Sequence, residues 1–349
     1  MKIHFENTVY SPQEFVQLAS TVPSYAALFA FIEGWLSDQK TFHFQSSGST
    51  GKPKKIEIKR RQIETSVFAS ARALSLSPKD RVLLCLSPAY IASTMMMARA
   101  LILDMDIYIE KPSANPLHLL DHPIDFASFV PFQIYKMIED RSFGQLEGIK
   151  NILIGGAPLS GEAFDILSSL NTNIYLTYGM TETVSHIALM KVQGKSEDAY
   201  YDVIDGVKIG QDEAQCLNIS GIITDNQRIQ TTDVVQILSP KKFLWLGRAD
   251  FVINSGGIKI HPEQLEKTIA SLLPQTHYFI SSVADTQLGS KCVLITETAI
   301  TDALFGQIQA LITDQFSKHH SPKEQHTITP FITTESGKLN RKTTMQQLH

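Results

Sequence analysis

The sequence predicts an α/β fold, with a large N-terminal α/β domain that carries a small β subdomain and a smaller α+β C-terminal domain. Of the 349 residues, 43% are hydrophobic and 19% are charged, which is a globular composition. Short aliphatic segments alternate with helical stretches before Tyr200. The pattern of predicted strands and helices changes there and again after Gly247. Because a single core seldom grows beyond about 250–300 residues, we expect two domains, at 1–247 and 248–349.

The first half of the chain alternates short strands with helical stretches, which is the order of an α/β domain. One helix is entered through Pro131, a residue that suits a first helical turn. The predicted strands are Val82–Leu86, Ile152–Ile154 and Ile174–Thr177, and the predicted helices are Arg61–Leu74, Ile91–Leu103, Phe132–Asp140 and Gly161–Leu170.

Beyond Tyr200, short strands separated by turn residues predict a smaller antiparallel region. These strands are Val203–Ile204, Ala214–Ile219, Gly221–Ile223, Thr231–Ile237 and Phe243–Leu246. The last hundred residues are enough for a small domain. There we expect strands at Phe251–Ile253, Tyr278–Val283 and Cys292–Thr296, and helices at Pro262–Leu273 and Thr301–His319.

Charge and composition exclude several classes of protein. The 31 basic and 35 acidic residues give a net charge of −4, which argues against a nonspecific binder of nucleic acid or of a membrane surface. No window approaches the roughly 18 apolar residues that span a bilayer. We therefore expect a cytoplasmic protein. Cys85, Cys216 and Cys292 are widely spaced without a CxxC pair, so neither a disulfide framework nor a zinc site is indicated.

A Ser/Gly/Thr-rich segment near residue 50 has the composition of a phosphate-binding loop. The string SSGSTGKPKK begins at Ser46 and offers backbone N–H groups, hydroxyl donors and lysine cations together. It is not a Walker A loop, because Pro53 follows Gly51-Lys52 where a Ser or Thr is required. A solvated hairpin is the alternative.

Further polar strings lie at strand ends. The string YGMTET begins at Tyr178, and its aromatic ring, hydroxyls and carboxylate could stack a base, bond a phosphate and hold Mg²⁺. A turn capped by Thr and Glu is the alternative. Asp233 lies in a strand, where its carboxylate could accept from ribose hydroxyls.

The last two strings fall in the second half of the chain. The string from Gly247 to Glu263 places an arginine and an aspartate at the junction of the two predicted domains, followed by a Gly pair where a slim ligand could pass close to the backbone. The string ESGKLNR places Lys338 in a Gly-containing loop, for which a frayed basic tail is the alternative.

Taken in order, these five strings resemble the adenylate-forming superfamily of acyl-CoA synthetases, peptide-synthetase adenylation domains and luciferases. The resemblance runs from about Phe42 to Arg341 and includes the loop Ile152–Ser160. It implies two half-reactions. A carboxylate first attacks the α-phosphate of ATP to give an acyl-adenylate and pyrophosphate, and the thiol of CoA then displaces AMP. ATP, Mg²⁺, CoA and a small carboxylic acid are the implied ligands.

The resemblance also implies a role for each residue of the nucleotide site. Tyr178, beside Gly179, would stack on adenine. Thr181 would bond the α-phosphate, Glu182 would hold Mg²⁺, and Asp233 would take the ribose hydroxyls. The remaining implied nucleotide residues are Ser46, Ser47, Gly48, Ser49, Thr50, Gly51 and Lys54 around the β- and γ-phosphates, and Gly156, Ala157 and Pro158 at the adenine.

The resemblance assigns the second half-reaction to a rotation of the C-terminal domain. Arg248 would stay near the ribose and phosphate, and Lys338 would bridge the substrate carboxylate and the α-phosphate. Asp250 would be the hinge. Its rotation would withdraw the lysine and bring Gly256 and Gly257 to line a tunnel for pantetheine.

Within the superfamily, these strings are most similar to the o-succinylbenzoate–CoA ligases of menaquinone biosynthesis, whose acid carries a second, unreactive carboxylate. A buried anion needs a cationic or multi-donor partner. Arg99 is our candidate because it interrupts a Met-rich apolar helix, although it could instead snorkel to solvent. Ser185 and His186 could add donors, and Tyr90 could gate the pocket.

The sequence departs from the family pattern at several points. Only 45 residues precede Ser46, fewer than the family usually carries, and Thr232 stands where a glycine is usual. Two other functions stay open, namely loading of another aryl or acyl acid onto CoA or a carrier protein, and nucleotide sensing without catalysis. A homodimer is also compatible with the sequence.

Overall fold

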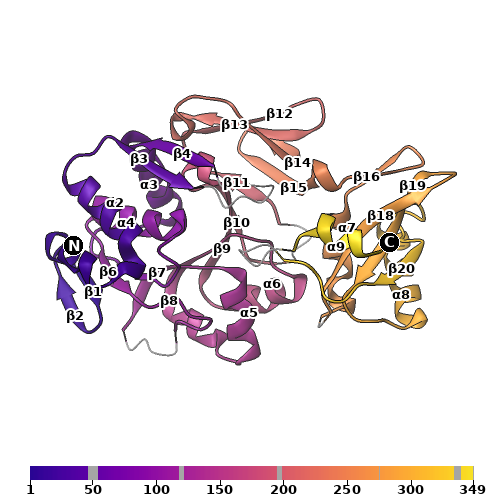
Figure 1. The fold of residues 1–349 in the computed structure, drawn as a ribbon, viewed down its shortest axis with the longest axis horizontal. Coiled ribbons are helices and arrows are strands. Elements are labelled where there is room, and N and C mark those ends of the chain that lie inside the picture. The colour runs from indigo at the N-terminus through magenta and orange to yellow at the C-terminus, as the bar shows by residue number, and fades with distance from the viewer. Residues whose placement is uncertain (46–53, 118–121, 195–198, 275, 334–338, 349) are drawn as a thin grey trace.

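The computed structural model covers the whole chain and describes every residue except 46–53, 118–121, 195–198, 275, 334–338 and 349. A large α/β body is followed by a smaller C-terminal body, so the predicted fold class is confirmed (Figure 1). The α-helices are α1 (Pro12–Phe15), α2 (Ala26–Leu36), α3 (Arg60–Leu74), α4 (Ile91–Leu103), α5 (Pro131–Glu139), α6 (Gly161–Ser168), α7 (Pro262–Ile269), α8 (Asp302–Gln315) and α9 (Arg341–Met345).

A 13-stranded sheet with the order β12-β13-β14-β15-β11-β10-β9-β8-β7-β5-β6-β1-β2 forms the centre of the large body. Six neighbours in it, β9, β8, β7, β5, β6 and β1, run parallel. The strands of this half are β1 (Ile3–Phe5), β2 (Thr8–Tyr10), β5 (Arg81–Leu84), β6 (Asp106–Ile109), β7 (Ile124–Phe129), β8 (Ile149–Ile154) and β9 (Asn173–Gly179).

Helices cover both faces of the parallel strands, which is why these strands are apolar on both sides. Alternate residues of β5 face opposite layers: Val82 and Leu84 pack in the core with α2, α3 and α4, whereas Leu83 packs in the core with α5 and α6. Cys85, Cys216 and Cys292 are buried and unpaired. No helix among the described residues is long and apolar enough to cross a membrane.

The antiparallel strands expected after Tyr200 continue the main sheet instead of forming a separate one. They pair onward from β9 and β10, and their bounds are β10 (His186–Lys191), β11 (Tyr201–Val203), β12 (Val207–Gln211), β13 (Cys216–Gly221), β14 (Ile229–Ser239) and β15 (Lys242–Arg248). The strand predicted at Gly221–Ile223 is wrong. Gly221 has a φ of +146° and leads into a 3₁₀ turn, Ile222–Thr224.

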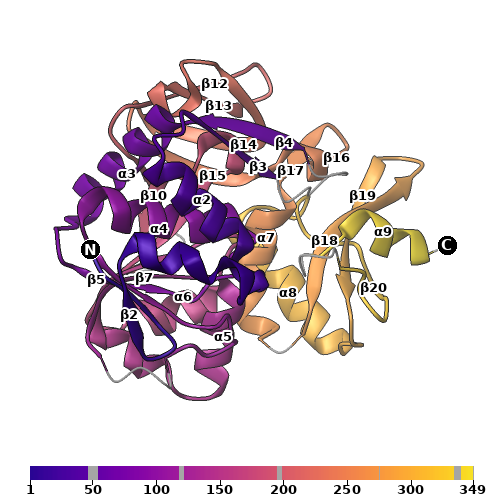
Figure 2. The same cartoon turned by 60° about the vertical axis from the view of Figure 1, so that its left-hand side comes forward.

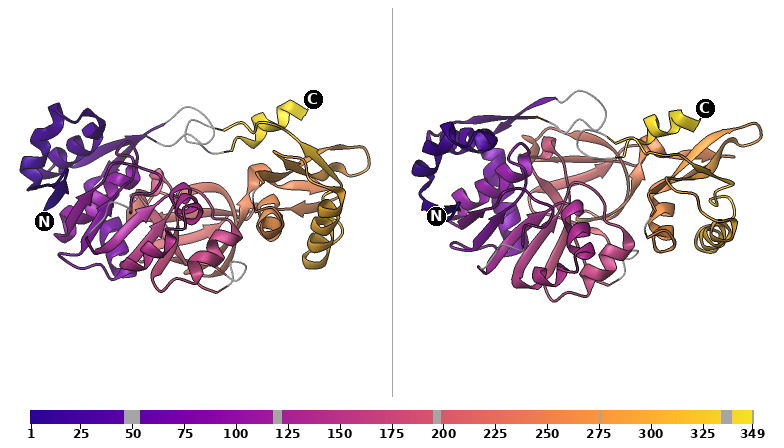
Figure 3. Two further views of the ribbon diagram at one scale, coloured as in Figure 1. Left: turned by 90° about the horizontal axis from the view of Figure 1, so that it is seen from below. Right: turned by 60° about the horizontal axis from the view of Figure 1, so that its bottom comes forward.

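The C-terminal body contains a hairpin, β16 (Ile253–Ser255) and β17 (Ile258–Ile260), and a second sheet, β18 (Tyr278–Asp285), β19 (Gly289–Thr296) and β20 (Glu324–Thr327). Gly256 and Gly257 have φ values of +58° and +83°, as a two-residue type I′ turn requires. Of the strand predicted at Phe251–Ile253, only Ile253 lies in a strand, because Ala249–Phe251 is a 3₁₀ turn and β16 begins at Ile253. The first chain segments and the C-terminal body lie at opposite ends of the molecule (Figures 1 and 3).

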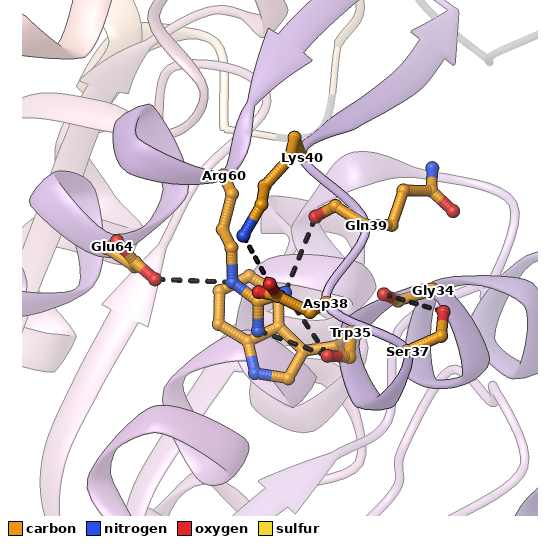
Figure 4. A network of polar contacts seen from close by, with 8 residues as sticks. All are labelled: Gly34, Trp35, Ser37, Asp38, Gln39, Lys40, Arg60 and Glu64. Carbon is orange, nitrogen blue, oxygen red and sulfur yellow. Dashed lines mark hydrogen bonds and ion pairs between the residues drawn. The ribbon is translucent and has the colours of Figure 1, made fainter.

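Arg60 ties the end of α2 to the start of α3 (Figure 4). Its guanidinium lies 3.7 Å from the centroid of the Trp35 ring, donates to the Trp35 carbonyl at 3.1 and 3.2 Å, and pairs with Glu64 at 3.3 Å. These contacts fix the base of the hairpin β3 (Thr41–Gln45) and β4 (Lys55–Lys59). The predicted phosphate loop connects these two strands, but Ser46–Pro53 lie outside the described residues.

Candidate active site

The carboxyl ends of β8 and β9 bring two predicted segments together. Gly155, which follows β8, donates its backbone N–H to Phe129, and a Cβ on it would lie 2.3 Å from Oγ1 of Thr177 in β9. Only a glycine lets the two segments approach so closely. Gly156, with a φ of +101°, begins the exposed loop that continues through Ala157 and Pro158. This edge of a parallel sheet is where α/β proteins bind ligands.

Tyr178 and Asp233 are in direct contact. The Tyr178 hydroxyl donates to Oδ2 of Asp233 at 2.7 Å, and the indole N–H of Trp245 donates to Oδ1 at 3.2 Å. Burial, followed by the Asp233 charge, raises the pKa of Tyr178, so its hydroxyl remains a donor. Trp245 was not predicted as a site residue, because in the sequence it is simply another apolar residue of a strand.

Arg248 lies opposite Asp233 in the pairing of β14 with β15. Its guanidinium donates to Oγ1 of Thr232 at 2.7 Å and to Asp250 at 3.0 Å. The Nε atom of Arg248 is buried without a hydrogen-bond partner among the described residues. The threonine that departs from the family pattern therefore serves here to orient the arginine.

Thr181 and Glu182 lie in a single 3₁₀ turn, Thr181–Thr183, directly after β9. Within the described part of the chain, neither side chain has a hydrogen bond or ion pair, and both are partly exposed. The capping role belongs to Thr183, whose hydroxyl accepts from the Met180 N–H at 3.0 Å. The chemistry-bearing groups of Thr181 and Glu182 are thus free to meet a ligand.

The chain turns sharply between β9 and β10. Val184 is fully buried with a φ of +67°, which a β-branched residue rarely adopts. A Cβ on Gly179 would lie 2.3 Å from the Ser185 carbonyl oxygen. This close crossing directs Ser185 and His186 inward.

Arg99 is buried. Only 2% of it is exposed, so the snorkelling alternative is wrong. Its guanidinium reaches Oγ of Ser185 at 3.1 Å and Oγ of Ser70 at 3.4 Å, and lies 5.9 Å from the centroid of the Phe126 ring. Among the described residues no carboxylate pairs with it, and its Nε has no partner. Burial lowers the pKa of Arg99 to about 10, which leaves it protonated at neutral pH.

His186 completes the group around Arg99. Its Nε2 lies 3.0 Å from Oγ of Ser70, and its Nδ1 lies 3.4 Å from Oγ of Ser185. Burial, followed by the Arg99 charge, lowers the pKa of His186 to about 3, so the ring is neutral near pH 7. Ser70 was missed. It shares the buried stripe of α3 with Ile63 and other apolar residues, and a serine on such a stripe is the signal that could have revealed it. We call Ser70, Arg99, Ser185 and His186 the arginine cluster.

Several predicted site residues lie apart from these groups or outside the described chain. Tyr90 is 51% exposed and precedes α4, nine residues and about 14 Å of helix before Arg99. Gly256 and Gly257 lie in the hairpin of the C-terminal body. Ser46, Ser47, Gly48, Ser49, Thr50, Gly51 and Lys338 fall outside the described residues, whereas Lys54 is described and exposed.

The family model described as AMP-binding enzyme matches residues 38–222, more than half of the chain. The chain belongs to this family. Its class, an adenylate-forming acid–CoA ligase, is the one the sequence predicted.

Individual relatives agree with this family. An acyl-CoA synthetase (AMP-forming)/AMP-acid ligase II-like protein from Dyadobacter fermentans is 38% identical. Its match covers 94% of this chain and 95% of that one, with a TM-score of 0.62. A 2-succinylbenzoate–CoA ligase from Listeria monocytogenes is 24% identical over 89% of this chain and 71% of its own length. The o-succinylbenzoate coenzyme A synthetase from Bacillus subtilis, solved with ATP and magnesium ion, shares the fold at 20% identity. That match covers 87% of this chain and 69% of that one, with a TM-score of 0.73.

Proposed function

We propose that this enzyme joins o-succinylbenzoate to CoA in two steps, adenylation by ATP and transfer to the thiol. The observation that carries the choice of acid is the buried guanidinium of Arg99, which has hydroxyl neighbours but no carboxylate partner among the described residues. Keeping a charge away from water is costly unless an opposite charge meets it. A substrate anion bound beside Arg99 would supply that charge.

The chemistry of the arginine cluster fits one additional carboxylate. Arg99 presents planar N–H donors that match a carboxylate, and the hydroxyls of Ser70 and Ser185 lie within reach of the same guanidinium. His186 is neutral at pH 7 and adds no second charge. Met96 and Phe126 are buried beside the guanidinium and offer apolar contact to an aromatic ring.

The groups on β9, β14 and β15 support binding of ATP at the sheet edge. Each carboxylate oxygen can accept more than one hydrogen bond, so Asp233 can take ribose hydroxyls while Tyr178 and Trp245 still donate to it. Glu182 would hold Mg²⁺, which neutralises charge on the phosphates when it is bound. Glu182 would supply one carboxylate ligand, and the phosphates would supply the other oxygens. Among the described residues, no cluster of three His, Cys, Asp or Glu occurs that could hold the ion by itself.

The reaction would then proceed by positioning and charge neutralisation. The reacting carboxylate of the acid attacks the α-phosphorus, and pyrophosphate leaves. Thr181 would donate to the α-phosphate, and Lys338 would neutralise charge between the two reactants. Rotation about Asp250 would next exchange Lys338 for the Gly256–Gly257 turn, and the CoA sulfur would attack the acyl carbon and release AMP.

Release of pyrophosphate across a panel of carboxylic acids, with and without CoA, tests this proposal. We expect o-succinylbenzoate to give the fastest release, with AMP and a thioester accumulating only when CoA is present. A clear preference for another acid would overturn the substrate assignment. Transfer only to a carrier-protein thiol would favour the loading function, and nucleotide binding without pyrophosphate from any acid would favour the sensor.

A further inference from the structure

Helix α7 of the C-terminal body reaches back across the proposed hinge at Asp250. The side-chain amide of Gln264 donates to the carbonyls of Trp245 and Leu246 at 3.0 and 3.2 Å. Oε1 of Glu263 accepts from the backbone N–H of Arg248 at 3.2 Å. All three partners of these side chains belong to β15, which precedes the hinge, and Figures 1 and 2 both show α7 between the large body and the second sheet.

The backbone at the end of β15 leaves room for the Glu263 carboxylate. Gly247 has a φ of +144°, and a Cβ on it would lie 2.4 Å from Oε2 and 2.9 Å from Cδ of Glu263. Any other residue would push the carboxylate away. Oε2 is buried without a partner among the described residues, and burial raises the pKa of Glu263. The carboxylate is therefore held here at some desolvation cost, which a change in domain orientation would relieve.

A second acidic residue of α7 is bonded within the C-terminal body. Both oxygens of Glu266 accept from the Arg341 guanidinium at 2.7 Å, and Oε1 also accepts from the Ile280 N–H at 2.7 Å. The guanidinium lies 4.8 Å from the centroid of the Phe251 ring, just after the hinge. This partly buried bidentate pair connects α7 to the segment that follows Lys338 by three residues. The orientation of α7 consequently sets the orientation of that segment.

We propose that Glu263 and Gln264 are positioning residues that latch the C-terminal body in this orientation and must release β15 before the body can turn. Their hydrogen bonds join atoms on opposite sides of Asp250, so rotation there must break them. The Glu266–Arg341 pair lies on one side of Asp250 and stays intact. The latch rests on the proposed two-step function, because only a reaction with two geometries needs its release.

The test compares Gln264→Ala with a matched control, Gln309→Ala. The Gln309 amide donates to the Pro322 carbonyl at 2.8 Å entirely inside the C-terminal body. Acyl-adenylate formation and thioester formation from supplied acyl-adenylate are measured separately. We expect Gln264→Ala to change the ratio of the two rates by about 5- to 10-fold, the size expected for losing one or two modest hydrogen bonds, and Gln309→Ala to leave it unchanged. An equal fall in both rates would overturn the latch.

A second readout does not depend on catalysis. The chain has two tryptophans, Trp35 and Trp245, and Trp245 lies under the latch. In a Trp35→Phe background, acrylamide quenching of Trp245 should increase when Gln264 is changed to Ala, and increase further with Gln264→Glu, whose carboxylate would face two carbonyls. Unchanged quenching in both variants would overturn the latch. Absence of pyrophosphate release by the unmodified chain would instead overturn the proposed function and leave the quenching result to decide the latch.

Discussion

In the proposed function, the choice of acid depends on the buried guanidinium of Arg99. It is held by hydroxyl groups at 3.1 and 3.4 Å, which orient it without neutralising it. Its pKa, lowered to about 10 by burial, keeps the charge in place across the physiological range. In the proposed function, this cation would pair with an anion that arrives with the substrate.

Replacing Arg99 with Ala should raise the KM for o-succinylbenzoate by about 30-fold or more, because losing one member of a buried charge pair usually costs at least ~2 kcal/mol. The KM for benzoate, which has no second carboxylate, should change far less. Arg81→Ala, which breaks a partly exposed pair with Asp125, is the control. Equal changes for the two acids would show that Arg99 does not bind the second carboxylate.

His186 makes the stability of the fold depend on pH. Its pKa is about 3 in the folded chain and 6.5 in the unfolded chain, so below pH 6.5 the unfolded state binds more protons. The neutral, buried ring therefore makes its full contribution to the free energy of unfolding above pH 6.5, and this contribution is lost as the pH falls toward 3. Between pH 6.5 and 5 we expect a loss of about 2 kcal/mol, at about 1.4 kcal/mol per unit.

Urea unfolding at pH 5 and pH 7 measures this effect. His186→Gln should reduce the difference in unfolding free energy between the two pH values by about that amount. His319→Gln, at an exposed position, should leave the difference unchanged. A pH dependence of His186→Gln equal to that of the unmodified chain would contradict the assignment.

The residue types of the arginine cluster were largely predictable, but their contacts were not. Arg99, Ser185 and His186 were each expected near the substrate, and the structure joins Arg99 to Ser185 across 86 residues of sequence. Ser70 was not expected, because a single hydroxyl in a helix rarely carries a signal. The pairing of Tyr178 with Asp233 depends on strand order, which the sequence pattern does not specify.

At the scale of elements, the crossing from β9 to β10 combines backbone strain with close approach. Val184 adopts a positive φ, and Gly179 lies against the Ser185 carbonyl. Since Thr181 and Glu182 occupy this same turn, its shape decides where both point. Strain at such a position is retained only where the surrounding structure enforces it.

Gly179→Ala should therefore lower stability by roughly 1–3 kcal/mol and strongly reduce adenylation, because its Cβ would meet backbone atoms that cannot move aside easily. Gly144→Ala, where a Cβ would meet nothing within 4 Å, should stay within about 0.5 kcal/mol of the unmodified chain. Urea unfolding and pyrophosphate release measure the two effects. Equal stability and activity in both variants would show that Gly179 and the Ser185 backbone do not approach each other closely.

Two helices of the first half were predicted closely. The helix expected at Ile91–Leu103 has those bounds in the structure, and α3 differs by one residue. The strand that was wrongly predicted at Gly221–Ile223 shows why a sequence pattern alone does not fix secondary structure. Its β-branched residues favour a strand, but the backbone turns at Gly221, and Gln62 of α3 donates to the Ile223 carbonyl at 2.8 Å. Tertiary contact overrides propensity there.

At the scale of the whole molecule, one sheet joins regions that the sequence presents as distinct. The parallel strands and the antiparallel strands after Tyr200 are hydrogen-bonded neighbours through β9, β10 and β11. Asp233 and Tyr178 are consequently held by one scaffold. The division at residue 247 remains a prediction, and so does the rotation that it would permit.

Lys338→Ala separates the two proposed geometries. We expect it to abolish acyl-adenylate formation, because the reacting anions lose their bridging cation. Thioester formation from supplied acyl-adenylate should largely persist, because the lysine would be withdrawn in that step. Pyrophosphate release measures the first step, and CoA consumption measures the second. Equal loss in the two assays would contradict the two-geometry account.

The three buried, unpaired cysteines have a practical consequence for measuring such motion. Burial raises the pKa of Cys85 and Cys292 to about 12 and also raises the pKa of Cys216, so these thiols stay protonated and shielded. A maleimide dye added at neutral pH should therefore leave the native chain unlabelled. One engineered surface cysteine on each body would then suffice for spectroscopic distance measurements without first stripping out the natural thiols.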